Sequence, residues 1–295
     1  MKPNLFIIGS MKAGTSYLWT LLNAHPSVFM SEPKEPCYFV DPRDLEAIFP
    51  WMWRRGYWKH EQNYLRLFEG SADAPVVGEA SVFYTYKPLA SGVAERLYRF
   101  NPDARLIYLM RDPVERTISH YWHNVRYFGE HRPIERAIRE DAQYLDVGDY
   151  AMQLAEYLAV FPRDQILMLT FEELAGDLER TMATVFGWLK LDGSITLPKI
   201  PPQNVTPGQF DGPVWLWRRL RQQNPLMRAA VDRLPPAVRR FGSGLVTREV
   251  NPGGADLSGI VDYLRPRQLR QTDTLADLLG RDFPRWTTLN ALEAA

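Results

Sequence analysis

The sequence contains a single cysteine in 295 residues, so no disulfide can form within the chain. A site built from several cysteines around zinc or an iron–sulfur cluster is excluded for the same reason. A chain that does without disulfides is typical of a reducing compartment. We therefore expect a cytoplasmic protein.

An excess of one charge is also lacking, because 35 Lys and Arg residues balance 35 Asp and Glu residues. A surface built for nucleic acid would be basic overall, so we expect no nucleic-acid partner. Long apolar runs are missing too: none reaches the roughly 18 residues that a membrane-spanning helix needs. Gly9 stops the first apolar run too early for a signal peptide. We expect no transmembrane segment and no leader.

What the chain does contain is a series of short apolar runs that alternate with amphipathic stretches. Buried strands are predicted at residues 4–8, 74–78, 104–110 and 165–170. Helices are predicted at residues 17–24, 88–100, 114–127, 150–161 and 273–286, the last closed by Gly280. Strands that alternate with helices predict an α/β fold, with a central parallel sheet flanked by helices. We expect one domain over residues 1–295.

Three segments stand out by their composition. Residues 41–68 are rich in aromatic side chains and are predicted to be an insertion that covers the core or stacks on an acceptor. Residues 197–213 are rich in proline, and residues 214–248 hold eight Arg and one Asp. This basic block is either an amphipathic part of a lid over residues 197–255 or a surface for an anionic membrane or an acidic acceptor.

The loop Gly9–Ser16, with the sequence GSMKAGTS, lies between the first strand and the first helix. Backbone N–H groups and the helix dipole converge on an anion at such a position. Small residues let the backbone approach the anion, Lys12 adds a positive charge, and Thr15 and Ser16 add hydroxyl donors. The alternative is an ordinary strand-to-helix turn.

The loop differs from the P-loop of nucleotide hydrolases, in which Gly, four residues and Gly are followed by Lys and Ser or Thr. Here Thr15 takes the place of that lysine, and Lys12 lies inside the loop. A P-loop kinase or nucleotide hydrolase remains the alternative function. It would need Thr15 or Ser16 on magnesium together with an acidic residue at a strand end, for which Asp112 is the candidate.

A second anion site is predicted where the strand at residues 104–110 ends. Arg111 follows that strand directly, and ligands of open α/β sheets bind at the carboxyl ends of the strands. Its guanidinium can bind a phosphate through two N–H groups. Ser119 lies eight residues later on the predicted helix. The alternative is that Arg111 pairs with Asp112 or Glu115.

Together these motifs, GSMKAGTSYL and LMRDPVERTISHY, resemble the sulfotransferases that use 3′-phosphoadenosine 5′-phosphosulfate (PAPS). The resemblance is nearest to the bacterial and heparan-type branch, and it implies a P-loop-like, nucleotide kinase-like architecture of three layers. It extends to the segments SEPKEPCYF (Ser31–Phe39), GEASVFY (Gly78–Tyr84) and LADLLGRDFPRW (Leu275–Trp286). A looser match involves Arg248, Asn251, Gly253 and Gly254.

The resemblance implies a cofactor and the residues that hold it. Arg111 and Ser119 would bind the 3′-phosphate of PAPS, and Arg248 would lie in a loop over the cofactor. The products would be a sulfated acceptor and adenosine 3′,5′-bisphosphate, with no metal required. The 5′-phosphosulfate would be held by Lys12, Ala13, Gly14, Thr15 and Ser16.

Two residues are candidates for the chemistry. Lys12 can stabilise the charge that develops on the leaving phosphate. Glu79, which we expect just beyond a buried strand, is the candidate general base for the acceptor proton. His120 and His123, on the helix that carries Ser119, are the alternative bases or else packed side chains.

Four further residues have weaker signals. Lys34 and Glu35 either flank the acceptor or form an ordinary ion pair, and Cys37 is expected in the core. Tyr150 is expected in the core, with contact to the cofactor or acceptor as the alternative. The acceptor is a small molecule or a glycan with a hydroxyl or amine, which the sequence does not identify further, because variable loops build acceptor sites on a shared fold.

Overall fold

The centre of the fold is one sheet of five parallel strands in the order β2-β3-β1-β4-β5. The computed structural model describes residues 1–71, 73–195, 197 and 256–291. The strands are β1 (Leu5–Gly9), β2 (Val28–Met30), β3 (Val76–Ala80), β4 (Arg105–Met110) and β5 (Ile166–Thr170).

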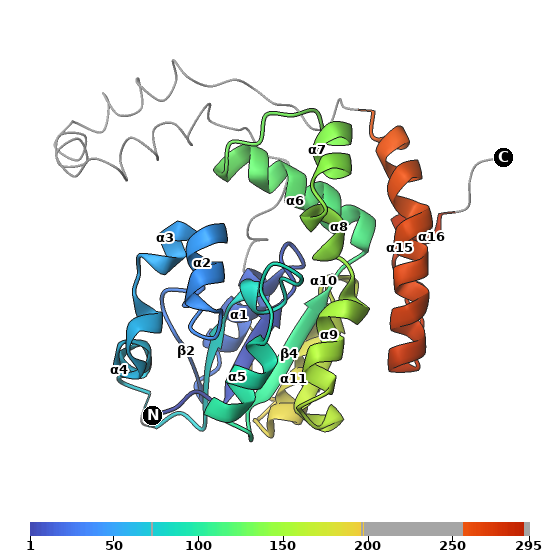
Figure 1. Ribbon diagram of the computed structural model, residues 1–295. Helices are drawn as coiled ribbons and strands as arrows, with labels where there is room; N and C mark the ends of the chain where they lie inside the picture. The colour runs from blue at the N-terminus through green and yellow to red at the C-terminus, as the bar shows by residue number, and fades with distance from the viewer. Residues whose placement is uncertain (72, 196, 198–255, 292–295) are drawn as a thin grey trace, which may run out of the picture.

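Helices connect the strands and cover the sheet (Figure 1). The α-helices are α1 (Thr15–Asn23), α2 (Pro42–Ile48), α3 (Pro50–Trp53), α4 (Glu61–Leu65), α5 (Val93–Phe100), α6 (Pro113–Tyr127), α7 (Ile134–Glu140), α8 (Gln143–Asp146), α9 (Tyr150–Leu158), α10 (Phe171–Gly176), α11 (Leu178–Leu189), α15 (Ser258–Leu279) and α16 (Thr287–Asn290). Short 3₁₀ turns are η1 (Tyr57–Lys59), η2 (Arg66–Phe68), η3 (Val82–Tyr84) and η4 (Arg163–Gln165).

Alternate residues of each strand point to opposite faces of the sheet, which produces two cores. Phe6 and Ile8 of β1 belong to the larger core, to which α5, α9 and α15 contribute side chains. Leu5 and Ile7 belong to the other core, with side chains from α1 and α11. The sheet thus lies between two layers of helices, which confirms the predicted three-layer α/β architecture (Figure 1).

All four predicted strands are present, and the structure adds a fifth. Strand β2 pairs with β3 through only three residues, too few for an apolar run to be recognised in the sequence. Strand β3 lies two residues later than predicted, so Glu79 is inside the strand and pairs with Phe6 of β1. Our expectation that Glu79 follows the strand was wrong.

The predicted helices are present with altered ends. Helix α5 begins only at Val93, because Gly92 precedes it with a left-handed φ of 68°. Helix α15 begins at Ser258, well before the predicted start, and Gly280 closes it with a φ of 60°, as predicted. Phe283 and Trp286, expected within that helix, follow it and stack on each other with ring centroids 4.2 Å apart.

The aromatic segment at residues 41–68 folds into short helices that cover the larger core. Phe49 packs on Phe83 with ring centroids 3.8 Å apart, and Tyr64 stacks on Tyr38 at 4.2 Å. Trp51 stacks on Phe128, which follows α6. The core-covering interpretation of this segment is therefore confirmed.

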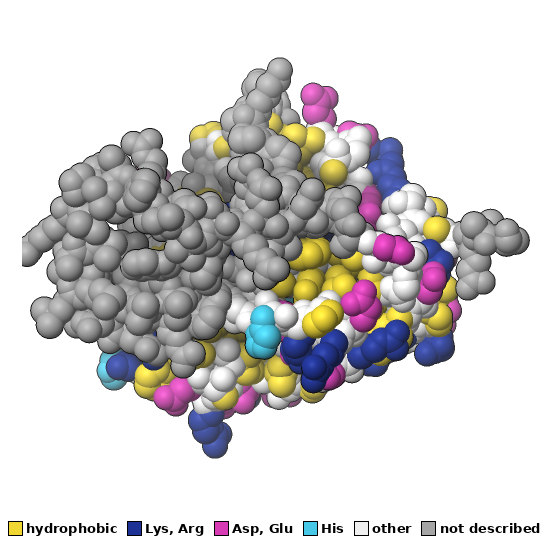
Figure 2. All heavy atoms as spheres, turned by 90° about the horizontal axis from the view of Figure 1, so that it is seen from above, with side chains coloured by type: hydrophobic (Ala, Val, Ile, Leu, Met, Phe, Trp, Pro, Cys, Tyr) yellow, Lys and Arg dark blue, Asp and Glu magenta, His cyan; other side chains and the backbone are white. Residues whose placement is uncertain are grey.

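The strands end toward α2, α3 and α6, at the top of Figure 1. Figure 2 views this end from above; in its described part, an apolar patch lies beside basic and acidic side chains. Among the described residues, no helix has both the length and the apolar character to cross a bilayer. The predicted lid over residues 197–255, including the block 214–248, lies outside the described residues.

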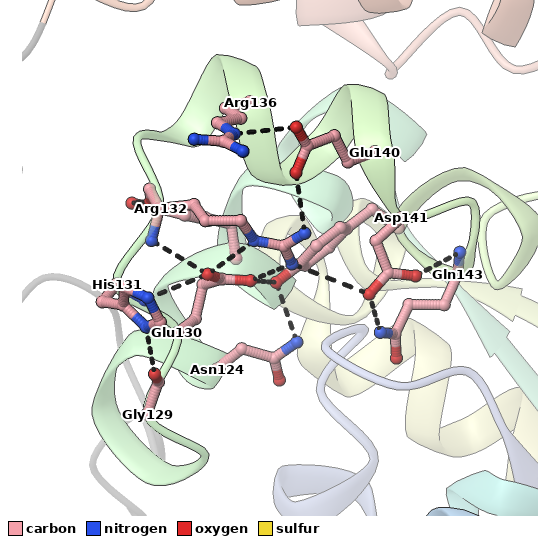
Figure 3. A network of polar contacts seen from close by, with 11 residues as sticks. Asn124, Gly129, Glu130, His131, Arg132, Arg136, Glu140, Asp141 and Gln143 are labelled. Carbon is pink, nitrogen blue, oxygen red and sulfur yellow. Dashed lines mark hydrogen bonds and ion pairs between the residues drawn. The ribbon is translucent and has the colours of Figure 1, made fainter.

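A network of charges joins the end of α6 to α7 and α8 (Figure 3). The guanidinium of Arg132 lies 2.5 Å from a carboxylate oxygen of Glu130, 3.3 Å from Glu140 and 3.9 Å from Asp141. The hydroxyl of Tyr144, on α8, donates to Glu130 at 3.3 Å. Hydrogen bonds from Arg132 lower the pKa of Glu130 to about 2.

Candidate active site

The loop between β1 and α1 follows a path that only glycine permits at two positions. Gly14 precedes α1 with a φ of 95°, and a Cβ atom there would lie 2.8 Å from the ring of Phe171. Gly9 has a φ of 152°, and its Cβ would lie 2.0 Å from Oγ1 of Thr85. Both glycines therefore fix the loop against its surroundings. Helix α1 begins at Thr15, two residues before the predicted start, so Thr15 and Ser16 lie in its first turn.

Lys12 projects from this loop with a left-handed φ of 70°. Burial, and then the charges of Arg111 and Arg126, lower the pKa of Lys12 to about 8. Like charges repel one another, so a protein gathers them where an anion completes the site. Lys12 follows β1 and Arg111 follows β4, and these two strands pair in parallel, so both residues lie at the same end of the sheet.

Phe171 and the sheet connect the loop with Arg111. The ring that would meet a Cβ on Gly14 also lies 5.1 Å from the guanidinium carbon of Arg111. The N–H of Ser10 donates to the carbonyl of Leu109 at 2.7 Å, which ties the loop to the end of β4. The two segments that the sequence predicts to bind anions thus lie against one ring at the carboxyl end of the sheet.

Arg111 follows β4 directly, as predicted. One of its terminal nitrogens donates to Glu115 at 2.6 Å, so the alternative ion pair is present. Its Nε atom is buried and finds no hydrogen-bond partner among the described residues. Because a guanidinium has five N–H donors, Arg111 retains donors for a ligand. Ser119 lies on α6 and is 7% exposed.

Asp112 is engaged in holding the fold together. It caps α6 by accepting from the N–H groups of Val114 and Glu115, and it also accepts from Thr288 and Leu289 of α16, each at 2.9 Å. The residue is 1% exposed. The magnesium ligand that a P-loop kinase would need is therefore occupied by backbone N–H groups, which disfavours that alternative.

Lys34 lies closer to the loop than the sequence indicated. Its ammonium is 2.9 Å from the hydroxyl oxygen of Ser16 and 3.5 Å from that of Thr15. It also lies 3.8 Å from a carboxylate oxygen of Glu35, so the expected ion pair is present and sits against the loop. No local pattern could have indicated this contact, because the sheet brings together residues 18 positions apart.

Glu79 is fully buried beneath this region. One of its oxygens accepts from the hydroxyls of Tyr84 at 2.6 Å and Tyr64 at 2.9 Å. The other oxygen accepts from the hydroxyl of Ser81 at 2.7 Å. Burial raises the pKa of Glu79 to about 7, although the three hydrogen bonds oppose the shift. Tyr64, from the aromatic segment, was not anticipated here.

Glu35 is the carboxylate beside the loop. Its side chain is 17% exposed, and one oxygen accepts from the N–H of Val82 at 2.8 Å. Burial raises its pKa, and the charge of Lys34 opposes the increase. Glu35 and Cys37 have left-handed φ values of 60° and 54°. Non-glycine residues in this conformation are strained, and such residues gather at functional sites.

The two histidines have packed surroundings. His120 is 1% exposed, and its ring meets that of Tyr144 edge to face. Burial, and then the charge of Arg116, hold the pKa of His120 well below its usual value. His123 packs against the rings of Tyr127 and Phe128.

Tyr150 and Arg248 are the two remaining positions predicted from the sequence. Tyr150 is buried at the start of α9 and donates its hydroxyl proton to the carbonyl of Arg111 at 2.7 Å. It therefore supports the residue that carries the predicted 3′-phosphate site. Arg248 and the glycines near it lie outside the described residues.

A sulfotransferase family model matches residues 3–194 of the chain. The membrane-associated sulfotransferase kil1 of Dictyostelium discoideum is 32% identical over 152 residues, which cover 49% of this chain and 29% of that protein. Mouse carbohydrate sulfotransferase 15 is 28% identical over 255 residues, covering 64% of this chain and 44% of that protein. The chain thus spans less than half the length of these two relatives.

Among solved structures, a sulfotransferase from Alicyclobacillus acidocaldarius is similar, with a TM-score of 0.65 and 27% identity. The match covers 97% of this chain and 99% of that one. The similarity therefore extends over the whole sheet and the helix layers on both of its faces.

Proposed function

This chain belongs to the sulfotransferase family, and from that premise we propose that it transfers a sulfuryl group from PAPS to a hydroxyl or amine of an acceptor. The observation that carries the proposal is that Gly14 of the loop and the guanidinium of Arg111 meet the same ring, that of Phe171. A nucleotide with an anionic group at each end of its ribose needs two such sites close together.

The residues at this edge fit that nucleotide. Arg111 has a buried Nε atom with no partner among the described residues, as a site for an additional anion requires. We propose that Arg111 and Ser119 bind the 3′-phosphate. The 5′-phosphosulfate supplies the sulfuryl group, and we propose that it is held by Lys12, Ala13, Gly14, Thr15 and Ser16.

Lys12 is the proposed stabiliser of the transition state. Sulfuryl transfer, like phosphoryl transfer, depends mainly on positioning and on charge stabilisation. The ammonium of Lys12 can follow negative charge as it moves to the leaving oxygen. Lys34, 2.9 Å from the Ser16 hydroxyl, brings a second ammonium to the same loop.

The proton of the acceptor needs a base, and two carboxylates are available. Glu79 was the prediction from the sequence, but it has no exposed surface and already accepts from three hydroxyls. Glu35 retains exposed surface and lies beside Lys34. We propose that Glu35 accepts the proton at Oε1, because its Oε2 atom already accepts from Val82. Loss of turnover in Glu79→Gln but not in Glu35→Gln would show that Glu79 is the general base instead.

A carbohydrate is the acceptor class that we propose. The support lies in the relatives, which include mouse carbohydrate sulfotransferase 15 and human heparan sulfate glucosamine 3-O-sulfotransferase 3B1. Incubation of the protein with labelled PAPS and a panel of glycans, phenols and lipids tests this choice. Label transfer only to non-carbohydrate acceptors would contradict it.

The cofactor is tested by thermal unfolding in the presence of nucleotides. A ligand that binds only the folded state raises Tm. Adenosine 3′,5′-bisphosphate should raise Tm to the same extent with and without magnesium. Stabilisation by magnesium and a nucleoside triphosphate, with no response to the bisphosphate, would instead support a kinase.

We also propose a cytoplasmic location and a bacterial source for the chain. The single cysteine supports a reducing, cytoplasmic compartment, and the resemblance of the motifs supports a bacterial source. Fractionation of cells that express the chain, with and without residues 214–248, tests the cytoplasmic location and the proposed membrane contact of that block. Recovery with membranes in both cases would contradict both proposals.

A further inference from the structure

The segment that carries Lys34 and Glu35 is held by the end of β3 and the residues after it. The N–H of Glu35 donates to the carbonyl of Ala80 at 2.9 Å. In return, the carboxylate of Glu35 accepts from the N–H of Val82 at 2.8 Å. The N–H of Cys37 donates to the hydroxyl oxygen of Ser81 at 3.1 Å. The strained turn from Glu35 to Cys37 is thus fixed at both of its left-handed residues.

The contact with Cys37 depends on how the Ser81 hydroxyl is oriented. A serine hydroxyl has one proton to donate and two lone pairs with which to accept. Here the proton is donated to Glu79 at 2.7 Å, which leaves a lone pair for the N–H of Cys37. A carboxylate is a strong acceptor, so it fixes this orientation more firmly than a neutral group would.

The carboxylate of Glu79 is itself held in place from two other parts of the chain. Tyr64 from α4 and Tyr84 from η3 donate to the oxygen that Ser81 does not use. All three hydroxyls are buried with it. The network therefore connects the aromatic segment, strand β3 and the turn that bears Glu35.

We propose that Glu79 is a positioning residue that, through Ser81, holds the turn from Glu35 to Cys37 so that Lys34 and Glu35 face the anion-binding loop. This inference rests on the proposed function. In this role the buried carboxylate of Glu79 aligns the residues that contact the substrates. It does not itself take a proton from a substrate.

Neutralising Glu79 should have little effect on Glu35. The charged groups that act on Glu35 are Lys34 and Arg55, and both favour its ionised form. Burial, and then the repulsion between the two carboxylates, raise the pKa of Glu79 to about 7, so Glu79 is protonated below about that pH. In Glu79→Gln the charges around Glu35 are unchanged over the acidic range, so the acidic limb of the pH profile should remain present.

The experiment compares Glu79→Gln, Ser81→Ala, the double variant and Glu35→Gln in steady-state PAPS-dependent transfer. Ser81→Ala removes the hydroxyl that joins Glu79 to Cys37. Loss of the hydrogen bond that holds the turn should lower kcat roughly 2- to 12-fold, as expected for one neutral hydrogen bond. Glu79→Gln should lower kcat, and the double variant should lose little more than the more severe single variant. Glu35→Gln should lose on the order of 10²–10⁴-fold, the range for a general base.

Three results would overturn the inference. A loss of 10²–10⁴-fold in Glu79→Gln, together with disappearance of the acidic limb, would make Glu79 itself the base. If the fold-losses in kcat of the two single variants multiplied in the double variant, Glu79 and Ser81 would act independently, and no link through Ser81 would exist. A lowered Tm with unchanged kcat in both would leave only a structural role.

Affinity for adenosine 3′,5′-bisphosphate reports folding in every variant and should match the wild type. If Glu79→Gln fails to fold, the kcat of Ser81→Ala tests the positioning role, and an unchanged kcat in that variant contradicts the inference. Thr184→Ala, which removes an exposed hydroxyl on α11, is the matched control and should behave as wild type. Absence of PAPS-dependent transfer in the wild type would refute the proposed function instead.

Discussion

Lys12 combines three properties that are seldom found in one lysine of a folded protein. It has a left-handed backbone, a partly buried ammonium, and Arg111 and Arg126 as its charged neighbours. Each of these properties destabilises the site when no anion is bound. The site is therefore organised for a ligand that carries negative charge.

Replacement of Lys12 by alanine should lower kcat by on the order of 10²–10³-fold, which is typical of one lost transition-state donor. Lys2→Ala is the control, because Lys2 is an exposed lysine that pairs with Glu61 at the other end of β1. Steady-state transfer assays with saturating PAPS measure both. Near wild-type kcat in Lys12→Ala would remove this residue from the chemistry.

The pKa of Lys12 predicts a loss of activity in base. Its pKa is lowered to about 8, so the free enzyme loses the ammonium as the pH rises through that value. We expect kcat/KM for PAPS to fall above about pH 8. A bound anion favours the charged lysine, so the corresponding limb in kcat should lie at higher pH. A kcat/KM that stays flat from pH 7 to 10 would contradict the assignment.

The turn from β1 into α1 depends on Gly14. Gly14→Ala must place a Cβ at a φ of 95° and 2.8 Å from the Phe171 ring, so it should lower stability by more than the ~1 kcal/mol of a left-handed residue alone, and weaken bisphosphate binding. Gly187→Ala is the control, because it lies in α11 with open space around it and should be neutral or stabilising. Urea unfolding and nucleotide titration measure both effects, and equal behaviour of the two variants would contradict the account.

Sequence patterns predicted the elements whose signals are local. Strands β1 and β4 are dense apolar runs, and the loop between Gly9 and Ser16 carries its own glycines and lysine. Strand β2 was missed because its three residues gain their strand character from pairing with β3. The contact between Lys34 and Ser16, and the donation from Tyr64 to Glu79, depend on which segments the sheet brings together. Such contacts leave no periodic signal.

Considered as a whole, the chain has balanced charge, yet it concentrates like charges at one sheet edge and opposite charges elsewhere. Lys12 and Arg111 gather at the carboxyl ends of the strands. By contrast, Arg132 lies among three carboxylates where α6 meets α7 (Figure 3). The first arrangement fits a ligand, whereas the second stabilises the fold.

The network around Arg132 predicts how stability depends on pH. The pKa of Glu130 is lowered from 4.5 to about 2, so its contribution is present above about pH 4.5 and is lost as the pH falls toward 2. Arg132→Ala should unfold more readily at pH 7 and should lose less stability than the wild type between pH 5 and 3. Arg136→Ala, which removes an exposed i,i+4 pair with Glu140, should keep the wild-type dependence. Parallel curves for all three proteins in urea unfolding would contradict the prediction.

The central claim, that Lys12 and Arg111 hold opposite ends of one nucleotide, is tested most directly by isothermal titration with adenosine 3′,5′-bisphosphate and adenosine 5′-monophosphate. The wild type should prefer the bisphosphate. Arg111→Ala should reduce that preference by about 1.5–3 kcal/mol, or roughly 10- to 150-fold, while binding the monophosphate as the wild type does. Lys12→Ala should weaken both nucleotides equally. If Arg111→Ala weakened both to the same degree, or neither, the claim would be contradicted.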